Sequence, residues 1–190
     1  MEIILASSSP RRWELLKQIG LEFRTLVYPV DETPPKGVSP SELVELLAER
    51  KASAVAGILD EGLIIGADTV VVCQGEVLGK PSDEEDAARM LRRLQGTAHE
   101  VYTGVALVDA ARGKSLIGHE KTRVYFRPLD EDEIRRYTAT GEPMDKAGAY
   151  AVQGLASIFI SGLEGCYFNV VGLPLARLSN MLKEFGYNVL

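Results

Sequence analysis

The sequence predicts a mixed α/β fold with a substantial antiparallel part, in a single domain that spans residues 1–190. Strand and helix signals alternate from the start of the chain, and two alternating apolar segments, 99–108 and 116–126, are typical of a long antiparallel pair. No linker long or polar enough to divide the chain is present, and 46% hydrophobic residues suffice for a packed core. We therefore expect one domain, or at most two small lobes that share a core.

The first elements alternate between strand and helix. Residues 2–6 are expected to form a short buried strand. Ser9 as N-cap and Pro10 at the first helical position then begin a helix, which Gly20 ends. A second strand is expected at 21–27.

A proline-rich loop leads to a helix that begins with a capping box made by Ser39 and Glu42. The apolar positions with helical spacing are Val44, Leu47, Ala48, Val55 and Ile58. β-branched residues then predict a strand at 63–73, which Gln74-Gly75 joins in a hairpin to 76–78.

Two further capped helices are expected on either side of the antiparallel pair. Ser82 with Glu85 caps the first, and Asp130 with Glu133 caps the second. Frequent glycines then break the chain into loops and short strands. Residues 174–185 predict a final amphipathic helix.

The charge balance excludes some classes of protein. With 21 Lys and Arg against 27 Asp and Glu, the formal net charge is −6, so we expect neither nucleic acid nor an anionic membrane as partner, because both attract basic surfaces. A small anionic substrate held by a local cluster of cations stays open. Cys73 and Cys166 are too few for a disulfide framework and indicate a reducing, cytoplasmic setting.

The segment Ser7-Ser8-Ser9-Pro10-Arg11-Arg12 places two arginines in the first turn of a helix, where the helix dipole favours acids. Free N–H groups at a helix N-terminus and adjacent arginines together can bind a phosphate. The alternative is that both arginines are solvated and pair with nearby acids such as Glu14. The residues alone leave both interpretations open.

Asp68 stands within an apolar strand, where an ionised carboxylate costs several kcal/mol unless it is paired or bound. A buried acid near a cavity suits a general base or a metal ligand. The alternative is that Gly66 breaks the strand and Asp68 caps a turn. These two interpretations also remain open.

Two further segments are candidate binding loops: Lys80-Pro81 and the glycine-rich segment 141–154. The alternative for segment 141–154 is an exposed connection whose charges are solvated.

The sequence contains no P-loop, no dinucleotide-binding glycine motif, no zinc-protease motif and no nucleophile elbow. His99 and His119 are the only histidines, and both are more typical of structural than of catalytic residues.

Taken together in chain order, these segments resemble the Maf family of nucleoside triphosphate pyrophosphatases, historically described as septum-formation inhibitors. The resemblance spans nearly the whole chain. The matching segments are Ala6-Ser7-Ser8-Ser9-Pro10-Arg11-Arg12, Val30-Asp31-Glu32, Lys51-Ala52, Gly66-Ala67-Asp68-Thr69-Val70-Val71, Gly79-Lys80-Pro81, Thr103-Gly104-Val105, Asp145-Lys146-Ala147-Gly148-Ala149-Tyr150, Gln153-Gly154 and Asn169-Val170-Val171-Gly172-Leu173-Pro174-Leu175.

The resemblance implies a fold related to that of the inosine triphosphate pyrophosphatases, with two lobes around a mixed, largely antiparallel sheet and a central cleft. It implies metal-dependent attack of water on the α-phosphorus of a nucleoside triphosphate, which releases the monophosphate and pyrophosphate. A homodimer is also implied, although no heptad seam in the chain supports it independently.

Carried over residue by residue, Asp68 is the expected catalytic acid/base. Arg11, Thr69 and Gln153 match the positions associated with base selection, in the combination that resembles the branch acting on dTTP and UTP. The expected substrate-binding and specificity residues are Ser7, Arg11, Arg12, Lys51, Thr69, Lys80, Lys146 and Gln153.

The arginines and lysines of that set form the expected cationic cradle for the triphosphate. Glu32, Asp68 and Asp145 are the expected ligands of Mg²⁺ or Mn²⁺, and the residues do not decide which of them touch metal and which act only as base. Two alternatives stay open: a pyrophosphatase for 7-methyl-GTP or another modified nucleotide, and a non-catalytic regulator of cell division that acts through a protein partner.

Overall fold

The structure is a computed structural model that describes residues 1–190. It divides into two compact units. The first comprises residues Met1–Asp68, Thr103–Glu120 and Gly172–Leu190, and the second comprises Thr69–Tyr102 and Lys121–Val171. No helix of the chain is both long enough and apolar enough to cross a membrane.

In the first unit, β1 (Ile3–Leu5) pairs in parallel with β2 (Arg24–Thr25) and with the start of β3 (Leu63–Cys73). The helices α1 (Pro10–Gln18), α2 (Pro40–Ala56) and α6 (Leu175–Lys183) belong to the same unit. Buried aliphatic side chains fill the space between α2 and the strands. They include Ile4, Ala48, Val55, Ile64 and Ala106.

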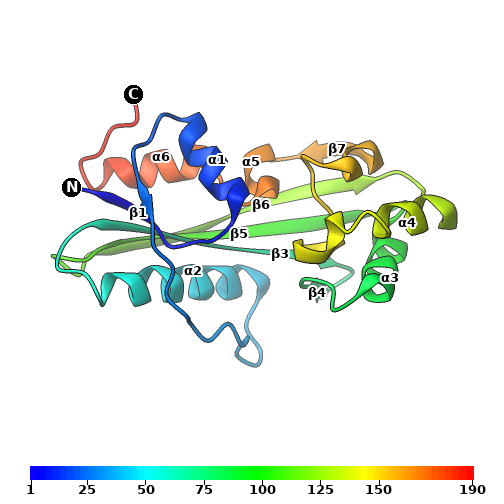
Figure 1. Cartoon of the computed structure of the whole chain (residues 1–190), viewed down its shortest axis with the longest axis horizontal. Helices are drawn as coiled ribbons and strands as arrows, with labels where there is room; N and C mark the ends of the chain where they lie inside the picture. The colour runs from blue at the N-terminus through cyan, green and yellow to red at the C-terminus, as the bar shows by residue number, and fades with distance from the viewer. The chain divides into compact units, whose positions relative to one another are not determined.

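Two glycines let α2 lie directly on the strands of this unit, along which it runs in Figure 1. A Cβ atom on Gly66 would overlap the carbonyl oxygen of Ala48, and one on Gly104 would overlap that of Val44. Gly66 therefore does not break β3, which is continuous from Leu63 to Cys73. It provides the space for a close approach between helix and strand.

In the second unit, the later part of β3 pairs antiparallel with β4 (Glu76–Leu78). The long strands β5 (Ala98–Asp109) and β6 (Ser115–Phe126) are neighbours in the sheet, and residues 103–109 and 115–120 of them belong to the first unit. The strand β7 (Ile160–Glu164) pairs antiparallel with β6. The strand order is β2-β1-β3-β5-β6-β7, with β4 beside β3. Parallel and antiparallel pairs therefore share one mixed sheet, as predicted.

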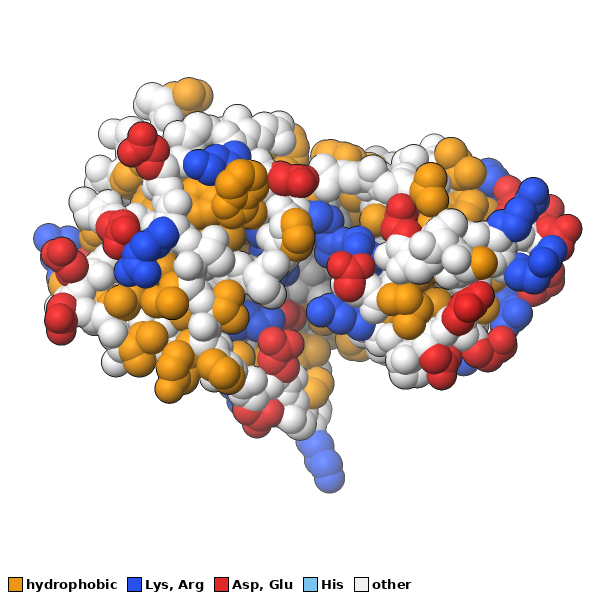
Figure 2. All heavy atoms as spheres, in the orientation of Figure 1, with side chains coloured by type: hydrophobic (Ala, Val, Ile, Leu, Met, Phe, Trp, Pro, Cys, Tyr) orange, Lys and Arg blue, Asp and Glu red, His pale blue; other side chains and the backbone are white.

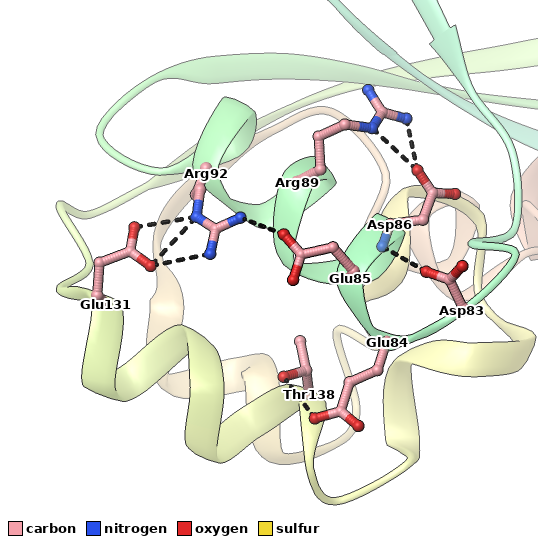
Figure 3. Close-up of polar contacts among 8 residues, drawn as sticks. All are labelled: Asp83, Glu84, Glu85, Asp86, Arg89, Arg92, Glu131 and Thr138. Atoms are coloured by element: carbon pink, nitrogen blue, oxygen red, sulfur yellow. Dashed lines mark hydrogen bonds and ion pairs between the residues drawn. The ribbon is translucent and has the colours of Figure 1, made fainter.

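The helices α3 (Glu84–Leu94) and α4 (Glu131–Thr138) lie side by side in the second unit (Figure 1). Arg92 donates to Glu131 and to Glu85 and so links the two helices (Figure 3). Acidic and basic side chains alternate over this surface (Figure 2). Such exposed pairs contribute little individually, since solvent screens them.

The C-terminal part of the second unit consists of short elements. Three 3₁₀ turns, η1 (Glu142–Asp145), η2 (Ala147–Ala149) and η3 (Leu155–Phe159), precede β7, and the short helix α5 (Tyr167–Val171) follows it. The sequence predicted loops and short strands here but not these helical turns. Their apolar residues are too few to show a helical period.

Several predicted element boundaries need correction. The strand expected at 21–27 is limited to Arg24–Thr25. Ile58 lies beyond the end of α2 and is exposed. Ser9 is the N-cap residue of α1, but its side chain makes no capping bond.

The cap of α3 also differs from the prediction. The N-cap is Asp83, whose carboxylate accepts the N–H of Asp86, and not Ser82. Both capping boxes, at Ser39 with Glu42 and at Asp130 with Glu133, are confirmed.

Candidate active site

Arg12 is held by two bonds at the start of α1. Its Nε donates to the carbonyl oxygen of Gly172 at 2.8 Å, and its Nη1 donates to the hydroxyl of Ser7 at 3.1 Å. The same hydroxyl accepts the N–H of Ser9 at 3.2 Å. The guanidinium is therefore fixed in direction and is not a freely solvated surface group.

The surroundings of Arg12 strengthen its interaction with an anion. The pKa of Arg12 is lowered to about 10, chiefly because the guanidinium is buried. The charges of Asp68 and Glu32 oppose this shift, whereas the charge of Arg11 adds to it. Arg12 is still positively charged at neutral pH. Because the Arg12 side chain is only partly exposed, solvent screens it less than a surface arginine, and a phosphate that reaches it would form a strong charge-assisted bond.

Asp68 lies inside β3 and is only 9% exposed. Its Oδ1 accepts a bond from Lys51 Nζ on α2 at 2.6 Å, and the same ammonium lies 3.2 Å from Glu32 Oε1. The interpretation of Asp68 as a turn cap is wrong, because the strand is continuous at this position. The lysine instead fixes the direction of the Asp68 carboxylate, and a carboxylate fixed in this way can act as a general base or as a metal ligand.

The Glu32 and Asp68 carboxylates fit the expected divalent ion. Both already converge on one positive charge, the Lys51 ammonium, and one or two carboxylates completed by phosphate oxygens and water are the ligands that Mg²⁺ usually takes. No group of three or more His, Cys, Asp or Glu side chains that could hold a metal ion is present. The third expected ligand, Asp145, pairs with Lys146 in the second unit.

In the second unit, the Lys80 segment is tied to the loop that carries Lys146. The N–H of Gly148 donates to the carbonyl oxygen of Gly79 at 3.0 Å. Gly148 has φ +70°, and a Cβ atom there would overlap the side chain of Val71. Glycine is therefore required at this position both for its backbone conformation and for space.

Gln153 is exposed at the tip of a four-residue turn. The turn is closed by a bond of 3.1 Å from the N–H of Gly154 to the carbonyl oxygen of Ala151. Thr69, the other expected base-selecting residue of this unit, is half-buried in β3 directly after Asp68. The segment 141–154 is therefore structured and is not a simple solvated connection.

The expected residues fall into two sets. The first unit contains Ser7, Arg11, Arg12, Glu32, Lys51 and Asp68. Within it, Lys51 pairs with both Glu32 and Asp68, and the charges of these two acids and of Arg11 act on the Arg12 guanidinium. The second unit contains the other set: Thr69, Lys80, Asp145, Lys146 and Gln153.

The second unit also contains a buried polar pair that the sequence did not predict. His99 Nε2 lies 2.8 Å from the hydroxyl of Tyr150, and both rings pack against Phe126. Burial lowers the pKa of His99 to about 4, so the imidazole is neutral at pH 7. The structural interpretation of His99 is thus supported, but no spacing rule links it to Tyr150, since they are 51 residues apart.

The overall fold is that of a known class of mixed α/β proteins. The chain superposes on the Ham1 protein of Staphylococcus aureus with a TM-score of 0.54 and 15% identity, over 97% of each chain. This likeness confirms the predicted fold class.

A family model described as Maf-like protein matches residues 2–185, and the chain therefore belongs to the Maf family, as the sequence motifs indicated. Curated relatives support this over the full length. The chain is 71% identical over 189 residues to a dTTP/UTP pyrophosphatase of Pelotomaculum thermopropionicum, covering 100% of this chain and 99% of the relative. It is 57% identical over 187 residues to a dTTP/UTP pyrophosphatase of Desulforamulus reducens, covering 98% of each chain.

Proposed function

We propose that the protein is a dTTP/UTP pyrophosphatase, which hydrolyses these nucleotides to the monophosphate and pyrophosphate. The observation that carries the proposal is the Asp68 carboxylate, nearly buried and paired with Lys51 within the electrostatic field of Arg12. The relatives' activity agrees with it, since the chain is 71% identical to one dTTP/UTP pyrophosphatase and 57% identical to another.

The residues of the first unit would perform the chemistry. Arg12 binds the negatively charged phosphates, and its bonds to Ser7 and Gly172 fix its direction beforehand, so little reorganisation is needed in the transition state. Lys51 holds the Asp68 carboxylate in one position. Asp68 accepts the proton of the attacking water as the water oxygen bonds to the α-phosphorus and pyrophosphate leaves.

Mg²⁺ or Mn²⁺ would be held by Glu32 and Asp68 together with phosphate oxygens, and would supply charge neutralisation during phosphoryl transfer. Lys80 and Lys146 of the second unit supply further positive charge for the triphosphate. Asp145 is a third candidate ligand.

Selection of the base would fall to Arg11, Thr69 and Gln153. A uracil or thymine ring presents a carbonyl acceptor beside an N–H donor, and the amide of Gln153 offers the complementary pair. The exposed position of Gln153 at the tip of its turn is compatible with such a contact. The two free cysteines suit a cytoplasmic enzyme, and the proposed assembly is a homodimer.

A nucleotide panel tests the proposed function. The purified protein is incubated with dTTP, UTP, CTP, ATP, GTP and 7-methyl-GTP in the presence of Mg²⁺ or Mn²⁺, and the products are identified. We expect pyrophosphate and a monophosphate, with dTTP and UTP giving the highest kcat/KM. Release of orthophosphate, a preference for a purine, or no turnover of any nucleotide would overturn the proposal.

A further inference from the structure

The turn that presents Gln153 needs external support. Its two central residues, Val152 and Gln153, are followed by the 3₁₀ turn η3, and a single backbone bond closes it. Ala151 and Val152 of this turn are buried, but Gln153 is exposed, so packing alone does not fix the direction of its side chain. A side chain that reads a base must instead be held in one place.

Glu142, at the start of η1, provides that support. Its Oε2 accepts the N–H of Leu155 at 3.0 Å, and its Oε1 accepts the N–H of Ala156 at 3.5 Å. These N–H groups lie at the start of η3, where the first amides have no partner within the helix. The carboxylate is thus bonded to the chain two and three residues after Gln153.

A buried tyrosine fixes Glu142 in turn. The hydroxyl of Tyr137 donates to Glu142 Oε1 at 2.9 Å, and the Tyr137 ring packs edge-on against Phe159, with centroids 5.2 Å apart. Burial and the neighbouring carboxylate raise the pKa of Tyr137, so the hydroxyl keeps its proton and remains a donor. Phe159 belongs to η3. The Glu142 carboxylate therefore contacts the start of η3, and the Tyr137 ring contacts its end.

Gly154 leaves the space for this contact. A Cβ atom on Gly154 would overlap the Glu142 carboxylate. The backbone of Gly154 has φ −103°, which any residue can adopt, so glycine is not needed here for its conformation. The requirement is space for the carboxylate.

We propose that Glu142 is a positioning residue for base selection, because its carboxylate holds the turn that presents Gln153. The contacts of Glu142 with Tyr137, Leu155 and Ala156 are called the Glu142 clamp below. The inference rests on the proposed function, in which Gln153 contacts the base. Glu142 itself need not touch the substrate.

Glu142→Ala tests the clamp, with UTP and CTP compared because their rings differ mainly in the groups that hydrogen-bond. The variant removes the carboxylate that accepts bonds from the Tyr137 hydroxyl and from the N–H groups of Leu155 and Ala156. We therefore expect KM for UTP to rise about tenfold and the preference for UTP over CTP to fall by a similar factor. The value of kcat should change little, because the residues assigned to the chemistry are intact. Glu142→Gln, which keeps one acceptor oxygen, should give an intermediate preference.

Gly154→Ala tests the same clamp by steric displacement. The added methyl group should push the carboxylate away from Leu155 and reduce the preference for UTP. In the Glu142→Ala background no carboxylate remains to be displaced, so the same methyl group should have little further effect. Independent, additive effects of the two substitutions would contradict the proposal.

Glu42→Ala is the matched control. Glu42 is also an acid that accepts a backbone N–H, that of Ser39 at 2.8 Å, but it belongs to the capping box of α2 in the first unit. This variant should lower the free energy of unfolding and leave the ratio of kcat/KM for UTP to that for CTP unchanged. If the wild type prefers UTP and Glu142→Ala keeps both its KM and its preference, the clamp is wrong while the proposed function stands. If the wild type hydrolyses neither UTP nor dTTP, the proposed function fails first.

Discussion

The two units hold their functional side chains in different ways. In the first unit, Asp68 is on a strand and Lys51 and Arg12 are on helices, so regular secondary structure sets the positions of their backbones. An ion pair between Lys51 and Asp68, and a bond from Arg12 to a carbonyl oxygen, then fix the directions of the side chains. In the second, Gln153 is on a turn that depends on side-chain bonds from distant residues such as Glu142. We infer that the proposed chemistry rests on side chains of regular secondary structure, while the contribution of Gln153 to base preference depends on a local turn.

The largest expected effect comes from the first unit. Asp68→Asn keeps the shape of the side chain and removes the base, so we expect kcat for UTP to fall about 10³-fold. The thermal unfolding midpoint should also fall, because the nearly buried Lys51 ammonium then keeps only Glu32 as a charged partner. Steady-state kinetics with UTP and with CTP provide the measurement. A variant with near-normal kcat would remove Asp68 from its assigned role.

The next effect tests how rigid the first unit is. Gly104→Ala should lower the free energy of unfolding by about 3 kcal/mol or more, because the new methyl group overlaps the backbone of α2 at Val44. Gly79→Ala is the matched control, since no atom lies near its added Cβ. Urea denaturation measures both. Equal stability of the two variants would mean that α2 can move away from the strands.

The second unit should show a dependence on pH that comes from His99. Its pKa is about 4 in the folded protein, below its ordinary value of 6.5, so the unfolded chain binds the proton more readily between these values. The stabilisation from neutral His99 is therefore present above pH 6.5 and is lost as pH falls toward 4. It amounts to about 3 kcal/mol.

His99→Phe isolates this contribution, because every other titrating group is unchanged. The variant should be less stable than the wild type at pH 7, since Tyr150 loses its partner, and the gap should narrow as pH falls to 4. Denaturation curves at several pH values measure it. A gap that is constant with pH would contradict a neutral, buried His99.

The smallest effect concerns the cap of α3. Asp83→Ala should lower the free energy of unfolding by about 1 kcal/mol, because the N–H of Asp86 loses its acceptor. Ser82→Ala should change it much less. The same denaturation experiment measures both variants, and the reverse order would restore Ser82 as the cap.

The sequence predicted the regular parts of the molecule better than its loops. The strand at 63–73 and the capping boxes follow from local patterns, which need no knowledge of distant residues. The cap of α3 was misplaced by one residue because Ser82 and Asp83 are both good N-cap residues. The second strand was overestimated because its apolar residues satisfy a strand pattern while only Arg24–Thr25 pair with a neighbour.

The candidate site shows the same division. The pattern of Asp68 in an apolar strand marked it as unusual, but its partner Lys51 was named only through the family resemblance, since pairing across elements leaves no local pattern. The partners of Glu142 and His99 were not predicted, because each of these residues bonds to another that is 13 or more positions away. Such contacts depend on tertiary packing, which no spacing in the chain specifies.

The most direct test of this division is the ratio of kcat/KM for UTP to that for CTP, measured in Asp68→Asn and Gln153→Ala beside the wild type. Asp68→Asn should slow both nucleotides by the same factor and leave the ratio unchanged. Gln153→Ala should collapse the ratio while the turnover of CTP continues at nearly the wild-type rate. A changed ratio in Asp68→Asn, or equal slowing of both nucleotides in Gln153→Ala, would contradict this division of roles between the two units.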